Sequence, residues 1–200
     1  MLNLVKIAIT GGVASGKSSV CQFFKELGAF VVSADAIVHE ILTPNTDLGR
    51  QVIHLLKVKN PPDGALFRKV IAEKVFKDPN LLASLEKILH PAVLKRIEEL
   101  YAEAAKKGTY TYFIVEIPLL FEIANEEFYD VVVAVLASES EAKKRFEQSG
   151  YRPDEYEERM QRQMSPSKKA SLADYTLFNN GSLEDLKKQV IVLNQTLQEL

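Results

Sequence analysis

The segment Gly11–Ser18, with the sequence GGVASGKS, constrains this chain more than any other part. It has the pattern G-x-x-x-x-G-K-[ST], in which glycines let the backbone approach phosphate groups and backbone N–H groups converge on the anion. A plain glycine-rich turn is the alternative, but the pattern follows a strand-like run and precedes a helical stripe, as a phosphate-binding loop requires. We therefore expect this segment, called the P-loop below, to bind a nucleoside triphosphate.

Each position of the P-loop has an expected role. Lys17 supplies a charge for the β- and γ-phosphates, and the Ser18 hydroxyl is a ligand for Mg²⁺. The residues expected to bind the nucleotide are Gly12, Val13, Ala14, Ser15, Gly16, Lys17 and Ser18.

Strand-like runs alternate with helical patterns on both sides of the P-loop. The runs 5–10, 30–32, 109–115 and 130–137 predict strands, and 175–178 predicts a shorter one. Alternating strands and helices are typical of a mostly parallel sheet with helices on both faces. The sequence thus predicts an α/β fold with a five-stranded sheet.

Two segments interrupt this alternation. Residues 47–105 have only helix-like periodicity, with breaks at 60–64, 77–80 and His90-Pro91, and residues 139–172 are polar and rich in charge. We expect a nucleotide-binding core (1–46, 106–138 and 173–200), a helical substrate-binding insertion (47–105) and a lid (139–172).

Composition excludes several classes of protein. The 25 Lys and Arg residues nearly balance 27 Asp and Glu, which argues against a broad nucleic-acid-binding surface. Cys21 is the only cysteine, so no disulfide forms within the chain. The N-terminus lacks a signal-peptide pattern and the apolar runs are too short to cross a membrane. We expect a cytoplasmic protein without nucleic-acid or membrane partners; its oligomeric state stays open, with a monomer favoured.

A P-loop alone does not separate kinases from GTPases or motor ATPases. The chain lacks the N/T-K-x-D motif that binds guanine. Asp35 follows the second predicted strand, where a carboxylate can accept a proton from an attacking hydroxyl, although it can equally be the N-cap of the next helix. Arg145 lies in a charged run and is either a phosphate clamp or part of a solvated helix face. Glu116 could belong to a Mg²⁺ shell or form a structural salt bridge.

The order of the motifs makes the chain resemble the dephospho-coenzyme A kinases. The shared features are the loop 10–18, Asp35, the His90-Pro91 pair, the stretch Pro118–Glu122 (PLLFE) and a late A-D…N-x-G segment at 173–181. This resemblance covers nearly the whole chain. It implies a P-loop kinase fold and transfer of the ATP γ-phosphoryl to the ribose 3′-hydroxyl of dephospho-CoA, with Mg²⁺.

The resemblance also implies roles for single residues. It makes Asp35 the base, with Lys17 and Arg145 as the other catalytic groups. It places Asn180 with the ATP-binding residues, and Arg68, His90 and Asp35 with the acceptor. Ser18 is the expected metal ligand.

The chain departs from the family pattern at four positions. Ser33 replaces the first carboxylate of the D-A-D box, and Phe67 replaces the Asp of a G-x-L-D-R motif. Ala14 stands where the loop usually has Gly, and Ser149 where it has a second lid arginine, for which Arg152 is a nearby substitute. A kinase for another nucleoside-phosphate or small hydroxyl acceptor, and a P-loop switch or binding module without catalysis, therefore remain alternatives.

Overall fold

The structure is a computed structural model that describes residues 4–75 and 78–199. The chain divides into two compact units: the first comprises residues 1–32 and 104–200, and the second residues 33–103. The two units are described separately below. No described helix combines the length and apolar character that crossing a membrane requires.

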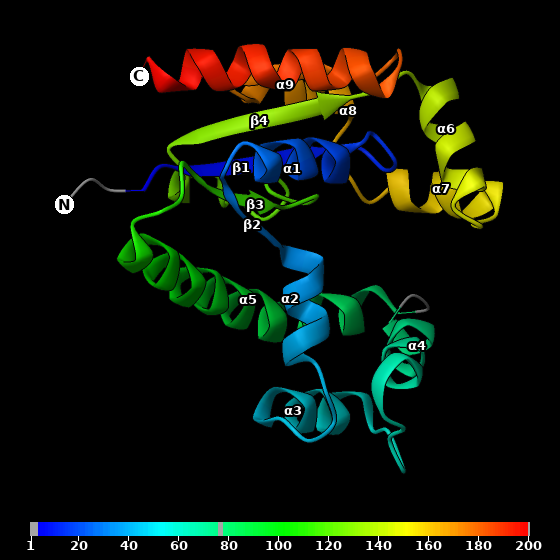
Figure 1. The fold of residues 1–200 in the computed structure, drawn as a ribbon. Helices are drawn as coiled ribbons and strands as arrows, with labels where there is room; N and C mark the ends of the chain where they lie inside the picture. Colours follow the sequence, from blue (N-terminus) through cyan, green and yellow to red (C-terminus); the bar gives the residue numbers. More distant parts are fainter. Residues whose placement is uncertain (1–3, 76–77, 200) are drawn as a thin grey trace. The chain divides into compact units, whose positions relative to one another are not determined.

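A five-stranded sheet forms the centre of the first unit (Figure 1). Its strands are β1 (Lys6–Gly11), β2 (Phe30–Ser33), β3 (Phe113–Glu116), β4 (Val131–Leu136) and β5 (Tyr175–Phe178), in the order β2-β3-β1-β4-β5. The β1–β3, β1–β4 and β4–β5 pairs are parallel. This sheet confirms the predicted α/β fold class.

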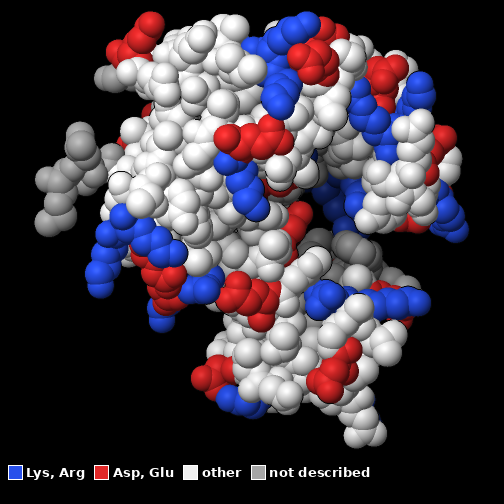
Figure 2. Space-filling view, viewed as in Figure 1, with Lys and Arg blue, Asp and Glu red and all other residues white. Residues whose placement is uncertain are grey.

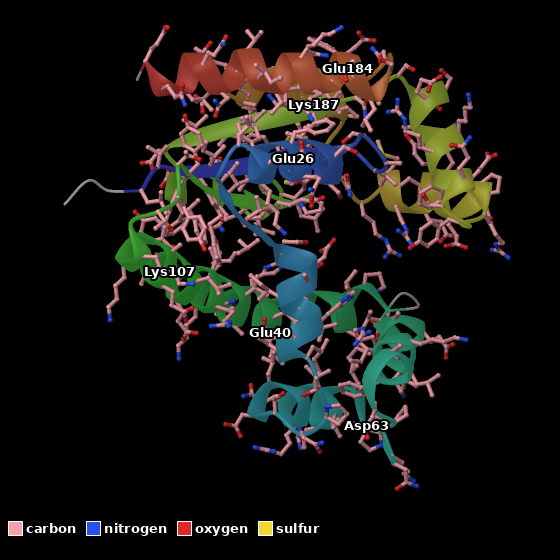
Figure 3. All side chains as sticks on the ribbon, in the orientation of Figure 1. Glu26, Glu40, Asp63, Lys107, Glu184 and Lys187 are labelled. Carbon is pink, nitrogen blue, oxygen red and sulfur yellow. The ribbon has the colours of Figure 1, made fainter. Side chains whose placement is uncertain are left out.

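Helices α1 (Lys17–Glu26) and α9 (Leu183–Gln198) cover one face of this sheet. Ile7 and Ile9 of β1 belong to the same apolar cluster as Phe24 of α1 and Leu186 of α9. The two helices are also linked at their surface, where Lys187 Nζ lies 2.9 Å from Glu26 Oε2. Figure 3 labels both residues. The intervening residues of β1 point to the other face, where α8 (Pro166–Leu172) lies against β1 and β4.

Three helices follow β4 in the segment predicted as a lid: α6 (Glu139–Gln148), α7 (Pro153–Met160) and α8. Ala142, Phe146 and Tyr156 form a small apolar cluster between α6 and α7. A short 3-10 helix, η1 (Glu126–Phe128), precedes β4.

The second unit is helical, as the sequence predicts for most of this region. It contains α2 (Ala34–Ile41), α3 (Asp47–Leu56), α4 (Gly64–Val75) and most of α5 (Pro79–Lys107). Its core includes Val52, Phe67, Ile71 and Leu85. The unit begins at residue 33 and so includes α2, which the sequence analysis assigned to the core. The binding role of the predicted insertion, 47–105, stays a prediction.

The predicted helix break at His90-Pro91 is wrong. Helix α5 runs from Pro79 to Lys107 with Pro91 inside it. Proline removes one helical hydrogen bond. Here Leu85 before Pro91, and Val93 and Ile97 after it, are buried, so packing on both sides keeps the helix continuous. The break predicted at 77–80 lies partly outside the described residues, and α5 begins within it.

Candidate functional site

The P-loop connects the end of β1 to the start of α1. Gly16 is the N-cap of α1, with a φ of 101° that favours glycine. A Cβ at this position would overlap the side-chain amide of Asn179, so the close approach of Asn179 also requires glycine. A loop with this backbone conformation, backed by the positive end of α1, suits the anion-binding role that the sequence predicts.

Lys17 is held inside this cradle by the backbone of the loop. Its side chain is buried, and its Nζ donates hydrogen bonds to Gly12 O at 2.7 Å and Gly11 O at 3.2 Å. The ammonium is thus satisfied by carbonyl oxygens of the same loop. To reach a phosphate, it has to exchange these bonds for phosphate oxygens.

Ser18 is paired with a carboxylate from the neighbouring strand. Its Oγ donates a hydrogen bond of 2.9 Å to Glu116 Oε1. Glu116 ends β3 in register with Ile9 of β1, so parallel pairing brings the end of β3 alongside the P-loop. A hydroxyl and a carboxylate are both oxygen donors, the kind that Mg²⁺ prefers.

Two asparagines follow β5. Asn179 is buried, and its Nδ2 donates a 2.9 Å hydrogen bond to Ser15 O in the P-loop. Asn180, the predicted ATP-binding residue, is exposed, and its Oδ1 accepts a 2.6 Å hydrogen bond from Ser138 N. The sequence analysis missed Asn179; the available signal was its position directly after the last strand, because the carboxyl ends of parallel strands line the ligand crevice.

Arg145 belongs to the same group of residues. Its Nη1 donates a 2.9 Å hydrogen bond to Asn179 O, and its Nη2 lies 3.6 Å from Glu141. The structure therefore connects Arg145 of α6, through Asn179, to the carbonyl of Ser15. Arg152 is the exposed N-cap residue of α7 and pairs with Asp154 at 2.6 Å.

Asp35 is not the N-cap of the helix that follows β2, as one reading of the sequence had it. Ser33 is the N-cap of α2, and its Oγ accepts a 3.4 Å hydrogen bond from Ala36 N. Asp35 lies exposed in the first turn of α2. Ser33, which replaces an aspartate of the family pattern, therefore still caps the helix. The Asp35 carboxylate does not cap α2.

Arg68 and His90 lie on α4 and α5 of the second unit, and both are half-buried. Phe67 is fully buried in the apolar core of the unit. Its replacement of a family aspartate therefore adds to packing.

The helices of the predicted lid segment also contact the P-loop. Val13 and Ala14 pack against the cluster of Ala142, Phe146 and Tyr156. A Cβ at Gly12 would lie 3.3 Å from Pro166 Cγ and 3.8 Å from Met160 Sδ. Acidic and basic side chains are interspersed over α6 and α7 (Figure 2).

Lys143 forms an ion pair within α6 and a second one with α7. Lys143 Nζ of α6 lies 2.6 Å from both Glu139 and Glu157, and these carboxylates raise the pKa of Lys143.

A parallel sheet with a P-loop and a hydroxyl–carboxylate pair beside it is the architecture of a P-loop nucleotide-binding protein. A model of the dephospho-CoA kinase family matches residues 5–185. The chain belongs to the dephospho-CoA kinase family.

Individual relatives agree with this assignment. A dephospho-CoA kinase of Protochlamydia amoebophila is 42% identical over 200 residues, which cover 99% of this chain and 98% of the relative. A solved structure from Thermus thermophilus has a TM-score of 0.80 at 31% identity, covering 99% of this chain and 98% of that one. Dephospho-CoA kinase from Campylobacter jejuni has a TM-score of 0.71 at 25% identity, covering 97% of each chain. The predicted family and kinase class are confirmed, and the acceptor predicted from the motifs is favoured over another small hydroxyl.

Proposed function

We propose that this chain transfers the γ-phosphoryl group of ATP to the ribose 3′-hydroxyl of dephospho-CoA, giving CoA and ADP. The observation that carries the proposal is the Ser18–Glu116 hydrogen bond beside the buried Lys17, in a chain of this family. This hydrogen bond joins a hydroxyl and a carboxylate, the two groups whose oxygen atoms a kinase needs as Mg²⁺ ligands next to a triphosphate.

The P-loop binds and orients the triphosphate in this proposal. The P-loop backbone and the N-terminus of α1 bind the phosphates, and Lys17 exchanges its loop carbonyls for phosphate oxygens. Fixing the chain of phosphates in this way lowers the barrier mainly through positioning.

Ser18 and Glu116 are the residues that would hold Mg²⁺. Their oxygen atoms suit a hard cation, and their hydrogen bond already places them side by side. When bound, Mg²⁺ neutralises charge on the β- and γ-phosphates.

The remaining roles rest on the resemblance together with local chemistry. Asp35 accepts the proton of the 3′-hydroxyl, for which its exposed carboxylate at a helix start is suited. Arg145 neutralises charge on the transferred group, and its link to Asn179 orients it. Asn180 lies near the adenine, while Arg68 and His90 bind the acceptor. We also propose that the protein is cytoplasmic and monomeric. Size-exclusion chromatography with light scattering would test the oligomeric state.

The test is a transfer assay with ATP, Mg²⁺ and dephospho-CoA, with the product identified by mass and by its position of phosphorylation. A matched control is the analogue that lacks only the 3′-hydroxyl. We expect ADP release with dephospho-CoA and none above background with the 3′-deoxy analogue. Transfer to shikimate or a nucleoside monophosphate, without transfer to dephospho-CoA, would contradict the proposal. ATP binding without transfer to any acceptor would leave only a binding module.

A further inference from the structure

The buried lysine of helix α8 is the feature of the first unit that the roles above leave unexplained. Lys169 is fully buried, and its Nζ lies 2.9 Å from Glu122 Oε1, a side chain that is 18% exposed. Its ammonium also donates a hydrogen bond to the carbonyl of Pro118. Lys169 therefore contacts both ends of the PLLFE stretch, a motif with no role so far.

The carbonyl of Pro118 connects this lysine to the strand that enters the P-loop. Thr10, the residue before Gly11, is fully buried, and its Oγ1 donates a 3.3 Å hydrogen bond to the same Pro118 oxygen. Ile117 N donates a 3.0 Å hydrogen bond to Ile9 O. The backbone that follows Glu116 is thus fixed against β1 by its own pairing and by the shared acceptor.

Glu122 connects the same lysine to the end of the lid. Its Oε1 accepts a 2.7 Å hydrogen bond from Met164 N, two residues before α8 begins at Pro166. Its other oxygen, Oε2, is buried and has no hydrogen-bond partner among the described residues. Pro166 in turn approaches Gly12 of the P-loop. Lys169 and Glu122 therefore fix the point at which the lid returns to the P-loop.

Placing a charged pair where water is excluded costs free energy that its mutual attraction only partly offsets. Burial lowers the pKa of the Lys169 ammonium, and the Glu122 carboxylate opposes that shift. An apolar pair of the same size would pack at least as well. What an apolar pair lacks is directed bonds to two separate segments: the backbone after β3, at Pro118, and the lid, at Met164.

We propose that Lys169 and Glu122 are positioning residues for phosphoryl transfer, which hold the backbone that carries Glu116 and the returning end of the lid in one arrangement around the P-loop. The inference rests on the proposed Mg²⁺ role of Glu116. Neither residue touches the reacting groups; both act through the main chain at Pro118 and Met164. In this proposal the PLLFE stretch connects three parts of the site: β3, which carries Glu116, the P-loop and the lid.

The test compares Lys169→Met/Glu122→Gln, which removes both charges, with Lys168→Met, which removes the exposed lysine next to it on α8. Calorimetry measures the affinity for a non-hydrolysable ATP analogue with and without Mg²⁺, and the transfer assay gives kcat and the KM for dephospho-CoA. The double variant should melt within about 4 °C of wild type, because no unpaired charge remains.

We expect the double variant to lose most of the gain in nucleotide affinity that Mg²⁺ gives the wild type. Its kcat should fall by about tenfold or more, since small displacements of positioning groups have effects of that size. The KM for dephospho-CoA should stay within about twofold, because the acceptor contacts are unchanged. Lys168→Met should match wild type in all three.

A folded double variant with wild-type kcat and wild-type Mg²⁺ dependence would overturn the inference and make the pair purely structural. Should the double variant fail to fold, Lys169→Met alone decides, because it removes the bond to the Pro118 carbonyl while Glu122 keeps its bond from Met164 N. A reduced Mg²⁺ gain in Lys169→Met supports positioning, and an unchanged gain contradicts it. The binding measurement needs no acceptor, so it stays valid even if dephospho-CoA proves not to be the substrate.

Discussion

Ala14, at the tip of the P-loop, has a backbone φ of 51°, in the left-handed region that favours glycine. A Cβ in this conformation costs about 1 kcal/mol. The family has glycine here, and the structure gives the physical reason. Ala14 also packs against the lid cluster of Ala142, Phe146 and Tyr156, and that contact offsets part of the strain.

Replacing Ala14 by glycine should therefore change stability little or raise it. Glycine relieves the strain but adds conformational entropy to the unfolded chain. The net increase in the free energy of unfolding should therefore be about 0–1 kcal/mol. Urea unfolding measures it. Ala170→Gly, inside α8, is the control and should lose about 1 kcal/mol. A loss at position 14 as large as at position 170 would contradict the strain assignment.

Asp35→Asn tests the proposed base. The amide keeps the size of the side chain but accepts a proton poorly, so turnover should fall by about 100-fold or more. Affinity for ATP should stay near wild type. Asp47→Asn changes another exposed carboxylate in the first turn of a helix and is the matched control. Equal turnover of the two variants would exclude Asp35 as the base.

At the residue scale, sequence motifs predicted the residues that lie within one local segment of the chain. The GGVASGKS pattern was sufficient to place Lys17 and Ser18 in the loop that connects β1 to α1. Asn179 could not be identified in this way, because its bond to Ser15 O depends on the sheet order that brings β5 near the P-loop. The capping role of Ser33 was not predicted, although serine is a preferred N-cap residue.

Helix α9 illustrates how single elements are stabilised at their ends. Ser182 and Asp185 form a capping box: Asp185 N donates to Ser182 Oγ at 3.1 Å, and Ser182 N donates to Asp185 Oδ2 at 3.1 Å. The Ser182 hydroxyl, which donates a 2.6 Å hydrogen bond to Asp185 Oδ2, and the Ser182 N–H lower the pKa of Asp185 below its ordinary value. The helix supplies Leu186, Val190 and Leu193 to the core of the first unit, so its cap affects the whole sheet.

The lowered pKa gives a stability contribution with a defined pH range. A carboxylate with a depressed folded-state pKa stabilises the protein above the unfolded pKa, near 4, and this contribution is lost as pH falls through the folded value. Asp185→Asn should therefore destabilise the protein at pH 7, and the difference from wild type should shrink towards pH 3. Thermal melts across that range measure it. Glu184→Gln, beside it and exposed, is the control, and a difference independent of pH would refute the assignment.

At the scale of elements, periodicity predicted the strands well but the long helix poorly. The apolar runs before and after the P-loop correspond to β1 and β2, because buried strands need continuous apolar residues. Pro91 suggested a helix end, and α5 passes through it because burial of Leu85 and Ile97 outweighs one lost hydrogen bond. Tertiary packing of this kind is not visible in a local pattern.

The whole chain consists of two compact units, and we propose different ligands for them. Residues 1–32 and 104–200 carry the P-loop, Glu116 and the lid helices. Residues 33–103 carry Arg68 and His90, the proposed acceptor-binding residues. Ligand-induced protection should therefore differ between the units.

ATP at about 100 times its dissociation constant should stabilise the protein by about 2.7 kcal/mol. This corresponds to a rise in Tm of about 5–10 °C for a chain of this size. Chelating Mg²⁺ should remove much of the rise, because Ser18 and Glu116 then lack the cation they would hold. Hydrogen exchange should show the added protection mainly in the first unit with ATP, and in residues 33–103 with dephospho-CoA. Equal protection of both units by ATP alone would contradict the division of ligands.

The contact between Gly16 and Asn179 has a consequence for the order of events during synthesis. Gly16 of the P-loop leaves the ribosome well before the asparagine that fixes its backbone, because Asn179 is made 163 residues later. Strand β4, which flanks β1, is also translated in the later part. A nascent chain therefore carries the complete nucleotide signature long before it has a rigid cradle. We therefore expect competence to hold ATP only after Asn179 has been translated, so a chain terminated before that residue should not sequester nucleotide.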